Sequence, residues 1–125
     1  MTIIEAINKL DSLKPNSYSQ DEKVAWLSKL DGIIKEKVID THEDGEDIVF
    51  DGYDANTNTA AATDMLVPAP YDDIYVRWLE AQVDYANGEY GKYNNSITMY
   101  NAAYAEYAGY YNRKHMPKGA KLKYF

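Results

Sequence analysis

The stretch that decides the fold runs from Tyr90 to Tyr111 and reads YGKYNNSITMYNAAYAEYAGYY. A tyrosine or isoleucine recurs in it at spacings of three and four residues, which places these side chains on one face of an α-helix. The face consists of Tyr90, Tyr93, Ile97, Tyr100, Tyr104, Tyr107 and Tyr111. Tyrosine combines an apolar ring with a polar hydroxyl, so it suits surfaces that are buried against a partner but remain partly polar. The stretch therefore predicts a helix that serves packing and assembly more than chemistry.

Three roles are open to this helix. It can pack inside its own domain while one face meets another subunit, it can form a purely internal core, or it can stack sugars or bases. A stacking platform needs exposed basic residues between the aromatic rings, and Lys92 is the one base within the stretch. The flanking residues are mostly small or carry amides, so the charges that normally steer coiled-coil pairing are missing. We favour internal packing combined with a subunit interface.

Local start and stop signals predict three further helices. Thr2 and Ser19 are each followed three residues later by a glutamate, which is the pattern of a capping box at a helix start. Pro70 is expected to open the third helix, and Gly88 to end it. The predicted helices span about 3–14, 20–39, 71–87 and 89–112. The sequence therefore predicts an all-α fold, a compact bundle of about four helices in a single domain over residues 1–125.

Residues 40–70 break the helical pattern, and we expect a long irregular loop there. Its strand-like runs are 48–50 and 65–67, which either pair as a small hairpin or lie extended on the helices. About 30 residues is long for a structureless loop in a compact domain. The length predicts a loop that is ordered by a partner or left mobile.

The net charge of −7 is concentrated in this loop, because residues 40–54 contain seven acids and no Lys or Arg. Residues 113–123 contain five bases and no acid, and we expect 113–125 to form a flexible basic tail. The overall acidity argues against a general nucleic-acid-binding protein. Together with the tyrosines, these segments supply the candidate interface residues, which are Tyr90, Tyr93, Tyr100, Tyr104, Tyr107, Tyr111, Arg113, Lys114, Lys118, Lys121, Lys123, Asp44, Glu46 and Asp47.

No arrangement typical of catalysis or metal binding stands out in the sequence. There are no cysteines, which excludes disulfides, thiolate zinc sites and thiol nucleophiles. The two histidines, His42 and His115, lack metal-ligand spacing, and we expect both at the surface. We therefore predict no catalytic residue, no enzyme activity, no cofactor and no metal. Apolar runs are too short to span a bilayer, so we expect no membrane association.

The segment that begins at Asp54 has the alternating oxygen ligands of the first half of a calcium loop. The match then fails, because Thr59 stands where the loop needs glycine and Met65 where it needs a bidentate glutamate. A solvated loop is the expected structure here.

Several motifs resemble the head–tail connector proteins of phages and prophages from Gram-positive hosts. In the N-terminal half they are KPNSYS at 14–19, EK at 22–23 and WLSKLDG at 26–32. In the C-terminal half they are WLEAQ at 78–82, DY at 84–85, NGEY at 87–90, KYNNS at 92–96, MYN at 99–101, YYNR at 110–113 and HMP at 115–117.

The resemblance implies a small, mostly helical head-completion protein of the virion. Such proteins form a ring, usually a dodecamer, between the portal protein and a tail-side completion or stopper protein. They help to retain packaged DNA, which passes through the ring without sequence-specific binding. The implied locations are the head–tail interface of the virion and, during assembly, the host cytoplasm.

One alternative comes from a different class of protein. The same helical pattern suits a bacterial adaptor or regulatory module without catalytic activity, which binds a protein partner as a monomer or dimer. The size of the oligomer separates the two hypotheses.

Overall fold

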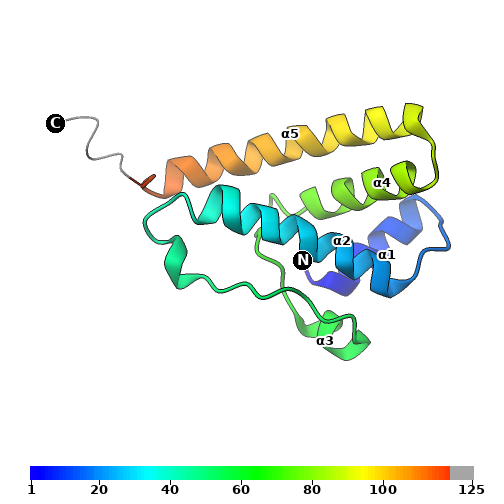
Figure 1. Ribbon diagram of the computed structural model, residues 1–125, viewed down its shortest axis with the longest axis horizontal. Coiled ribbons are helices and arrows are strands. Elements are labelled where there is room, and N and C mark those ends of the chain that lie inside the picture. Colours follow the sequence, from blue (N-terminus) through cyan, green and yellow to red (C-terminus); the bar gives the residue numbers. More distant parts are fainter. Residues whose placement is uncertain (119–125) are drawn as a thin grey trace.

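The computed structural model describes residues 1–118, apart from the side chain of Glu46. It contains five α-helices, and residues 1–118 form no β-strand, so the predicted all-α class is confirmed (Figure 1). The α-helices are α1 (Ile3–Leu13), α2 (Gln20–Ile34), α3 (Thr57–Ala62), α4 (Ile74–Ala86) and α5 (Tyr90–Lys114). Two short helical turns complete the fold, the π-helix η1 (Lys35–Ile39) and the 3-10 helix η2 (Gly45–Asp47).

The first two helices begin where their capping signals predict. The side chain of Thr2 accepts a hydrogen bond from the N–H of Glu5 over 3.3 Å, and the Glu5 carboxylate accepts one from the N–H of Thr2 over 3.0 Å. This pair satisfies two amide groups that the helix itself leaves free. The bond from the backbone N–H of Thr2 to the carboxylate, together with the Thr2 hydroxyl, lowers the pKa of Glu5. At the start of α2, the Ser19 hydroxyl accepts from the N–H of Glu22 over 3.2 Å.

The helix predicted over 20–39 changes its winding at Lys35. The N–H of Asp40 donates to the carbonyl of Lys35 over 2.8 Å, which is the i to i−5 bond of a π-turn. A wider turn lets the neighbouring side chains of Val38 and Ile39 both face the core, where they are 3% and 1% exposed. Local sequence signals do not predict this turn.

Helices α4 and α5 form an antiparallel hairpin that turns at Gly88. This glycine has φ of +73°, a conformation that favours glycine. The N–H of Gly88 donates to Tyr85 and the N–H of Glu89 donates to Asp84, which is the Schellman pattern of a helix end. The helix end predicted at Gly88 is thereby explained.

Helix α4 begins at Ile74, three residues later than the sequence predicts. The N–H of Tyr71 donates to the carbonyl of Pro68 over 3.0 Å, so Tyr71 closes a turn and does not open a helix. Regular helical bonding starts only beyond Asp73.

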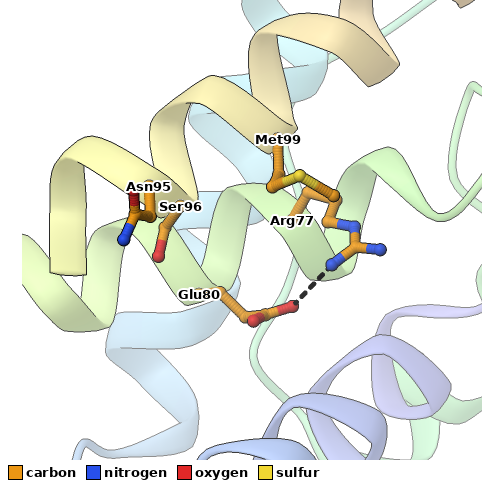
Figure 2. Close-up of a pocket in the computed structure, with 5 residues that line it drawn as sticks. All are labelled: Arg77, Glu80, Asn95, Ser96 and Met99. Carbon is orange, nitrogen blue, oxygen red and sulfur yellow. Dashed lines mark ion pairs between the residues drawn. The ribbon is translucent and has the colours of Figure 1, made fainter.

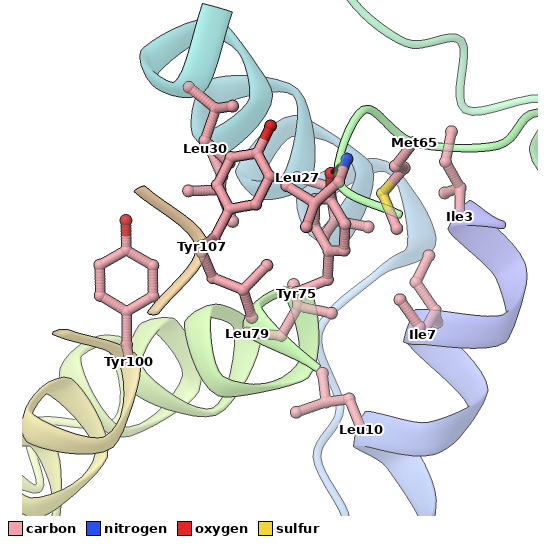
Figure 3. Packing of buried hydrophobic residues seen from close by; sticks show 14 of the residues in the cluster. Ile3, Ile7, Leu10, Leu27, Leu30, Met65, Tyr75, Leu79, Tyr100 and Tyr107 are labelled. Carbon is pink, nitrogen blue, oxygen red and sulfur yellow. Dashed lines mark hydrogen bonds between the residues drawn. The ribbon is translucent and has the colours of Figure 1, made fainter. Parts of the chain in front are cut away.

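The core lies around α4, which has α5 on one side and α1 and α2 on the other (Figure 1). Tyr75 and Tyr107 are the largest buried side chains at its centre, 0% and 1% exposed. Figure 3 shows them among aliphatic side chains, with Leu27 and Leu30 from α2 and Leu79 from α4. Full burial of side chains of this size stabilises a small domain by about 1.5–3 kcal/mol each.

The region predicted as an irregular loop contains α3 and η2 and no hairpin. Val49 is 78% exposed, so the run 48–50 does not form a buried strand, and the hairpin alternative is wrong. Met65 and Val67 are buried against the helices, as the other alternative expects. The segment before them pairs with the N-terminus through an isolated bridge between Thr2 and Asp64.

Helix α3 stands where the sequence predicts a solvated loop, so that prediction is wrong for Thr57–Ala62. The side chain of Asn56 accepts from the N–H groups of Asn58 and Thr59, over 3.0 and 3.4 Å, and so caps the helix. Asp54 accepts in turn from the N–H of Asn56 over 3.0 Å. The spacing of these oxygen-bearing side chains therefore reflects turn and cap formation.

Candidate assembly surfaces

The tyrosine face of α5 is partly core. Tyr100, Tyr107 and Tyr111 are buried, and Tyr104 is half-buried. The ring of Tyr100 lies 4.9 Å from that of Trp78 on α4, a contact that adds to the stability of the hairpin. These buried tyrosines hold α5 onto its own domain.

The other end of the face remains open at the α4–α5 turn. Tyr90 is 61% exposed and Tyr85 is 58% exposed. The ring of Tyr85 lies 5.8 Å from that of Tyr90 and 5.2 Å from that of Tyr93. We call Tyr85, Tyr90 and Tyr93 the hairpin-end tyrosines. They form a surface of amphipathic rings of the kind that is enriched in protein interfaces.

The opposite end of the hairpin joins the acidic and basic segments of one chain. Oδ2 of Asp44 lies 2.5 Å from Nδ1 of His115, an ion pair when the histidine is protonated. Two backbone hydrogen bonds of 2.9 Å join residues 41–43 to residues 116–118, which run antiparallel. The two segments, which the sequence presents as separate patches, thus meet within one molecule.

His42 is buried, so the expectation of a surface histidine is wrong for this residue. It is 2% exposed, and its Nδ1 donates to the carbonyl of Val38 over 2.6 Å. Its Nε2 lies 2.8 Å from Oδ1 of Asn112 on α5. The ring of His42 also contacts the ring of Tyr111 edge to face, with the two ring centroids 4.7 Å apart. His42 therefore connects the end of η1 to the end of α5, and its partner Asn112 lies 70 residues away in the chain.

Beside His42, the structure has a hollow of about 170 Å³ under the end of α5, which we call the aromatic hollow. Its walls are Ile39, Ile48, Leu66, Pro68, Tyr107, Tyr110, Tyr111 and His115. The hydroxyl of Tyr111 is buried and finds no hydrogen-bond partner among the described residues. Burial raises the pKa of Tyr111, and the charges of Asp44 and Asp40 raise it further.

A second hollow, of about 180 Å³, lies between α4 and α5. Figure 2 shows its lining residues, with Arg77 and Glu80 of α4 pointing toward each other and Met99 of α5 beside Arg77; Asn95 and Ser96 lie farther along α5. Arg77 and Glu80 form a loose ion pair at 3.8 Å. Four of the five side chains are polar, but they do not converge on one point, so the hollow lacks the arrangement of a nucleophile with its base.

Asp31 has a buried carboxylate that the sequence patterns did not predict. It is fully buried, and it accepts hydrogen bonds from the hydroxyls of Tyr53 and Tyr75 and from the N–H of Leu66. The hydroxyl of Tyr75 accepts in turn from the N–H of Val67 over 2.7 Å. Burial raises the pKa of Asp31, and the three donors act in the opposite direction. The network anchors residues 66–67 to α2 and α4.

The sequence contained one signal of this burial, since Asp31 follows Leu27 by four residues on the apolar side of its helix.

The remaining predicted interface residues lie at the charged end. Arg113 and Lys114 are exposed in the last turn of α5, and Asp44, Asp47 and Lys118 are exposed beside it. Lys121, Lys123 and the side chain of Glu46 lie outside the described residues. Within residues 1–118, the structure brings together no group of three or more potential metal ligands.

Comparison of the chain with protein-family models, with curated proteins and with solved structures found no match. Among the helices of residues 1–118, none combines the length and the apolar character needed to cross a membrane.

Proposed function

We propose that the protein is a virion structural protein, a head–tail connector that forms a ring between a portal protein and a tail-side completion protein. In this proposal the chain is a single domain, a compact bundle of about four helices with an acidic loop and a basic tail. The ring helps to retain DNA and lets it pass without sequence-specific binding. The protein acts without catalysis, in the host cytoplasm during assembly and then at the head–tail interface.

The observation that carries the proposal is the difference between the two ends of the α4–α5 hairpin. One end has the hairpin-end tyrosines, of which Tyr85 and Tyr90 are exposed, and the other gathers acidic and basic side chains. A closed ring needs two different surfaces on each subunit, one for each neighbour. The domain is small, and association extends the surface that a small domain can bury. The motif resemblance supports the same role.

Mass measurement by light scattering tests the proposal. The purified chain is measured alone and mixed with the portal protein encoded near its gene. We expect a ring-sized species in at least one of the two samples. A monomer that ignores the portal would contradict the proposal and favour the protein-binding adaptor.

A substitution pair links the assembly to the hairpin-end tyrosines. Tyr90→Ala removes a ring that is 61% exposed, so we expect little change in monomer stability but at least tenfold weaker assembly. Met99→Ala is the matched control, because Met99 is 48% exposed midway along α5, between the two ends of the hairpin. Equal assembly of both variants would show that these tyrosines do not lie in the interface.

A further inference from the structure

A short antiparallel pairing joins the charged end of the hairpin to the loop after η1. We call this pairing of residues 41–44 with residues 115–118 the junction. The N–H groups of Glu43 and Lys118 each donate over 2.9 Å to a backbone carbonyl of the opposite segment. Two backbone hydrogen bonds near the surface are a weak connection, because water competes for the same groups. The side chains around them therefore determine how firmly the two segments stay together.

His115 is the side chain that connects its segment to the loop and to α5. Its Nδ1 lies 2.5 Å from Oδ2 of Asp44 in the loop. Its ring stacks on the ring of Tyr111 in α5, with the ring centroids 3.9 Å apart and the planes 16° from parallel. His115 also forms part of the wall of the aromatic hollow. One ring thus contacts the loop, the end of α5 and the hollow.

The attraction between His115 and Asp44 depends on pH. A carboxylate attracts the imidazole ring strongly only when the ring carries its second proton, and a charged ring also interacts favourably with the face of an aromatic ring. Histidine changes its charge between about pH 5 and pH 8. The attraction is therefore present at the acidic end of this range and is lost as the pH rises through it.

The other charged groups around the junction do not follow the same change. Carboxyl groups, lysines and arginines ordinarily keep their charge between about pH 5 and pH 8. Burial raises the pKa of Tyr111, so its hydroxyl stays neutral there. The groups of this kind that the structure describes beside the junction are Asp40, which pairs with Lys35, and Glu43, Asp44, Asp47, Arg113, Lys114 and Lys118.

His42 is the second histidine at the junction, and its ring centroid lies 6.2 Å from that of His115. It is buried, its Nδ1 donates to the carbonyl of Val38, and its Nε2 lies beside the neutral side-chain amide of Asn112. Within residues 1–118 His42 makes no ion pair, so a positive charge on it would be buried without compensation. His115 has a carboxylate partner and is therefore the ring whose charge the junction favours.

We propose that the junction is a pH-sensitive clasp, in which protonated His115 holds residues 115–118 against residues 41–44 and loss of its proton releases them. Opening leaves the N–H of Glu43 and the carbonyl of Thr41 without their partners and removes part of one wall of the aromatic hollow. The charged end of the hairpin thus changes its shape with pH. The clasp lies within one chain, so the inference goes beyond the ring proposed above and does not depend on it.

Amide hydrogen exchange measured by NMR tests the clasp in the full-length chain. The N–H groups of Glu43 and Lys118 report the junction directly, and the N–H of Gly88, which donates to Tyr85 at the other end of the hairpin, is the internal reference. Exchange rates at about pH 5.5 and about pH 8 are divided by those of an unstructured peptide, which removes the pH dependence of exchange itself. We expect the protection of the two junction amides, relative to Gly88, to be about threefold to tenfold higher at the lower pH.

Two variants remove the pH-dependent charge pair and keep side chains of similar size. His115→Gln cannot become charged, and Asp44→Asn keeps the shape of an exposed partner. In both variants we expect equal protection at the two pH values, close to that of the natural sequence at the higher pH. Asp47→Asn is the matched control, because Asp47 is an exposed acid of the same loop that makes no ion pair within residues 1–118. This control should keep the pH dependence.

Three results would overturn the inference. One is equal protection of the junction amides at the two pH values in the natural sequence. Another is a pH dependence that persists in both His115→Gln and Asp44→Asn. The third is a midpoint that follows the NMR titration of the His42 ring and not that of His115. The experiment uses neither the portal nor a ring, so a failed clasp leaves the connector role intact, and a failed assembly on the portal leaves the clasp intact.

Discussion

At the scale of single residues, Asp31 shows how a polar side chain can organise an apolar core. Its carboxyl group is fully buried and makes no ion pair within residues 1–118, so its partners there are hydrogen-bond donors. Such a group is costly to bury unless its lone pairs are occupied. The donors come from the loop and from α4, so this residue fixes their positions relative to α2.

Removing one donor measures the strength of that network. Tyr75→Phe deletes the bond to Asp31 and also leaves the N–H of Val67 without its acceptor. We expect a loss of about 2–3 kcal/mol in the free energy of unfolding, measured by urea denaturation. Tyr53→Phe is the matched control, because this half-buried tyrosine has one bond to Asp31, and its loss should be nearer about 1 kcal/mol. Equal losses would contradict the central place given to Tyr75.

The same carboxyl predicts a pH dependence. Burial raises the pKa of Asp31 in the folded chain above its ordinary value of 3.8, so the folded state keeps this proton more tightly than the unfolded state. The resulting stabilisation is complete below pH 3.8 and is lost as the pH rises through the raised value. Melting temperatures measured from about pH 4 to pH 7 should therefore fall for the natural sequence relative to Asp31→Asn. A constant difference between the two proteins would show that Asp31 does not titrate in this range.

At the scale of elements, Gly45 limits how η1 and η2 meet. A Cβ atom at this position would collide with the backbone carbonyl of Ile39 at the end of the π-turn. We expect Gly45→Ala to lower the free energy of unfolding by about 2 kcal/mol, because backbone must move to relieve the contact. Gly91→Ala is the control, since no atom lies within 4 Å of its added Cβ and alanine favours a helix. Thermal melting should separate the two, and similar melting temperatures would contradict the tight fit.

The elements that could be predicted are those with local signals. The cap at Thr2, the stop at Gly88 and the spacing of tyrosines in α5 depend on residues within a few positions of each other. The π-turn, helix α3 and the burial of His42 were not predicted. The contact of His42 with Asn112 spans 70 residues, and no local pattern reveals it. The spacing of tyrosines in α5 likewise predicted that they share one face of the helix. It did not predict that Tyr107 is buried and Tyr90 exposed, because burial along this face depends on where α4 ends.

At the scale of the whole molecule, tyrosine serves as the main aromatic of the core, and this predicts sensitivity to alkali. Burial, with a smaller effect of Tyr104, raises the pKa of Tyr100 from 10.0 to about 12, and burial also raises the pKa of Tyr53, Tyr75 and Tyr107. The folded state therefore holds these protons more tightly, and the stabilisation is lost as the pH rises beyond 10.

We expect cooperative unfolding between about pH 10 and pH 12, with helix loss by circular dichroism coinciding with phenolate absorbance. Ionisation of the tyrosines without loss of helix would contradict the tyrosine core.

The position of Asp31 in the chain also determines when the protein can become compact during its synthesis. Tyr53, Leu66 and Tyr75, which hold its carboxylate, all follow it in the sequence. A ribosome that has released α1 and α2 has therefore not yet supplied the groups that make burial of this charge favourable. The apolar sides of both helices stay uncovered until α4 emerges, so a nascent chain stalled before residue 74 should be open to proteases and chaperones.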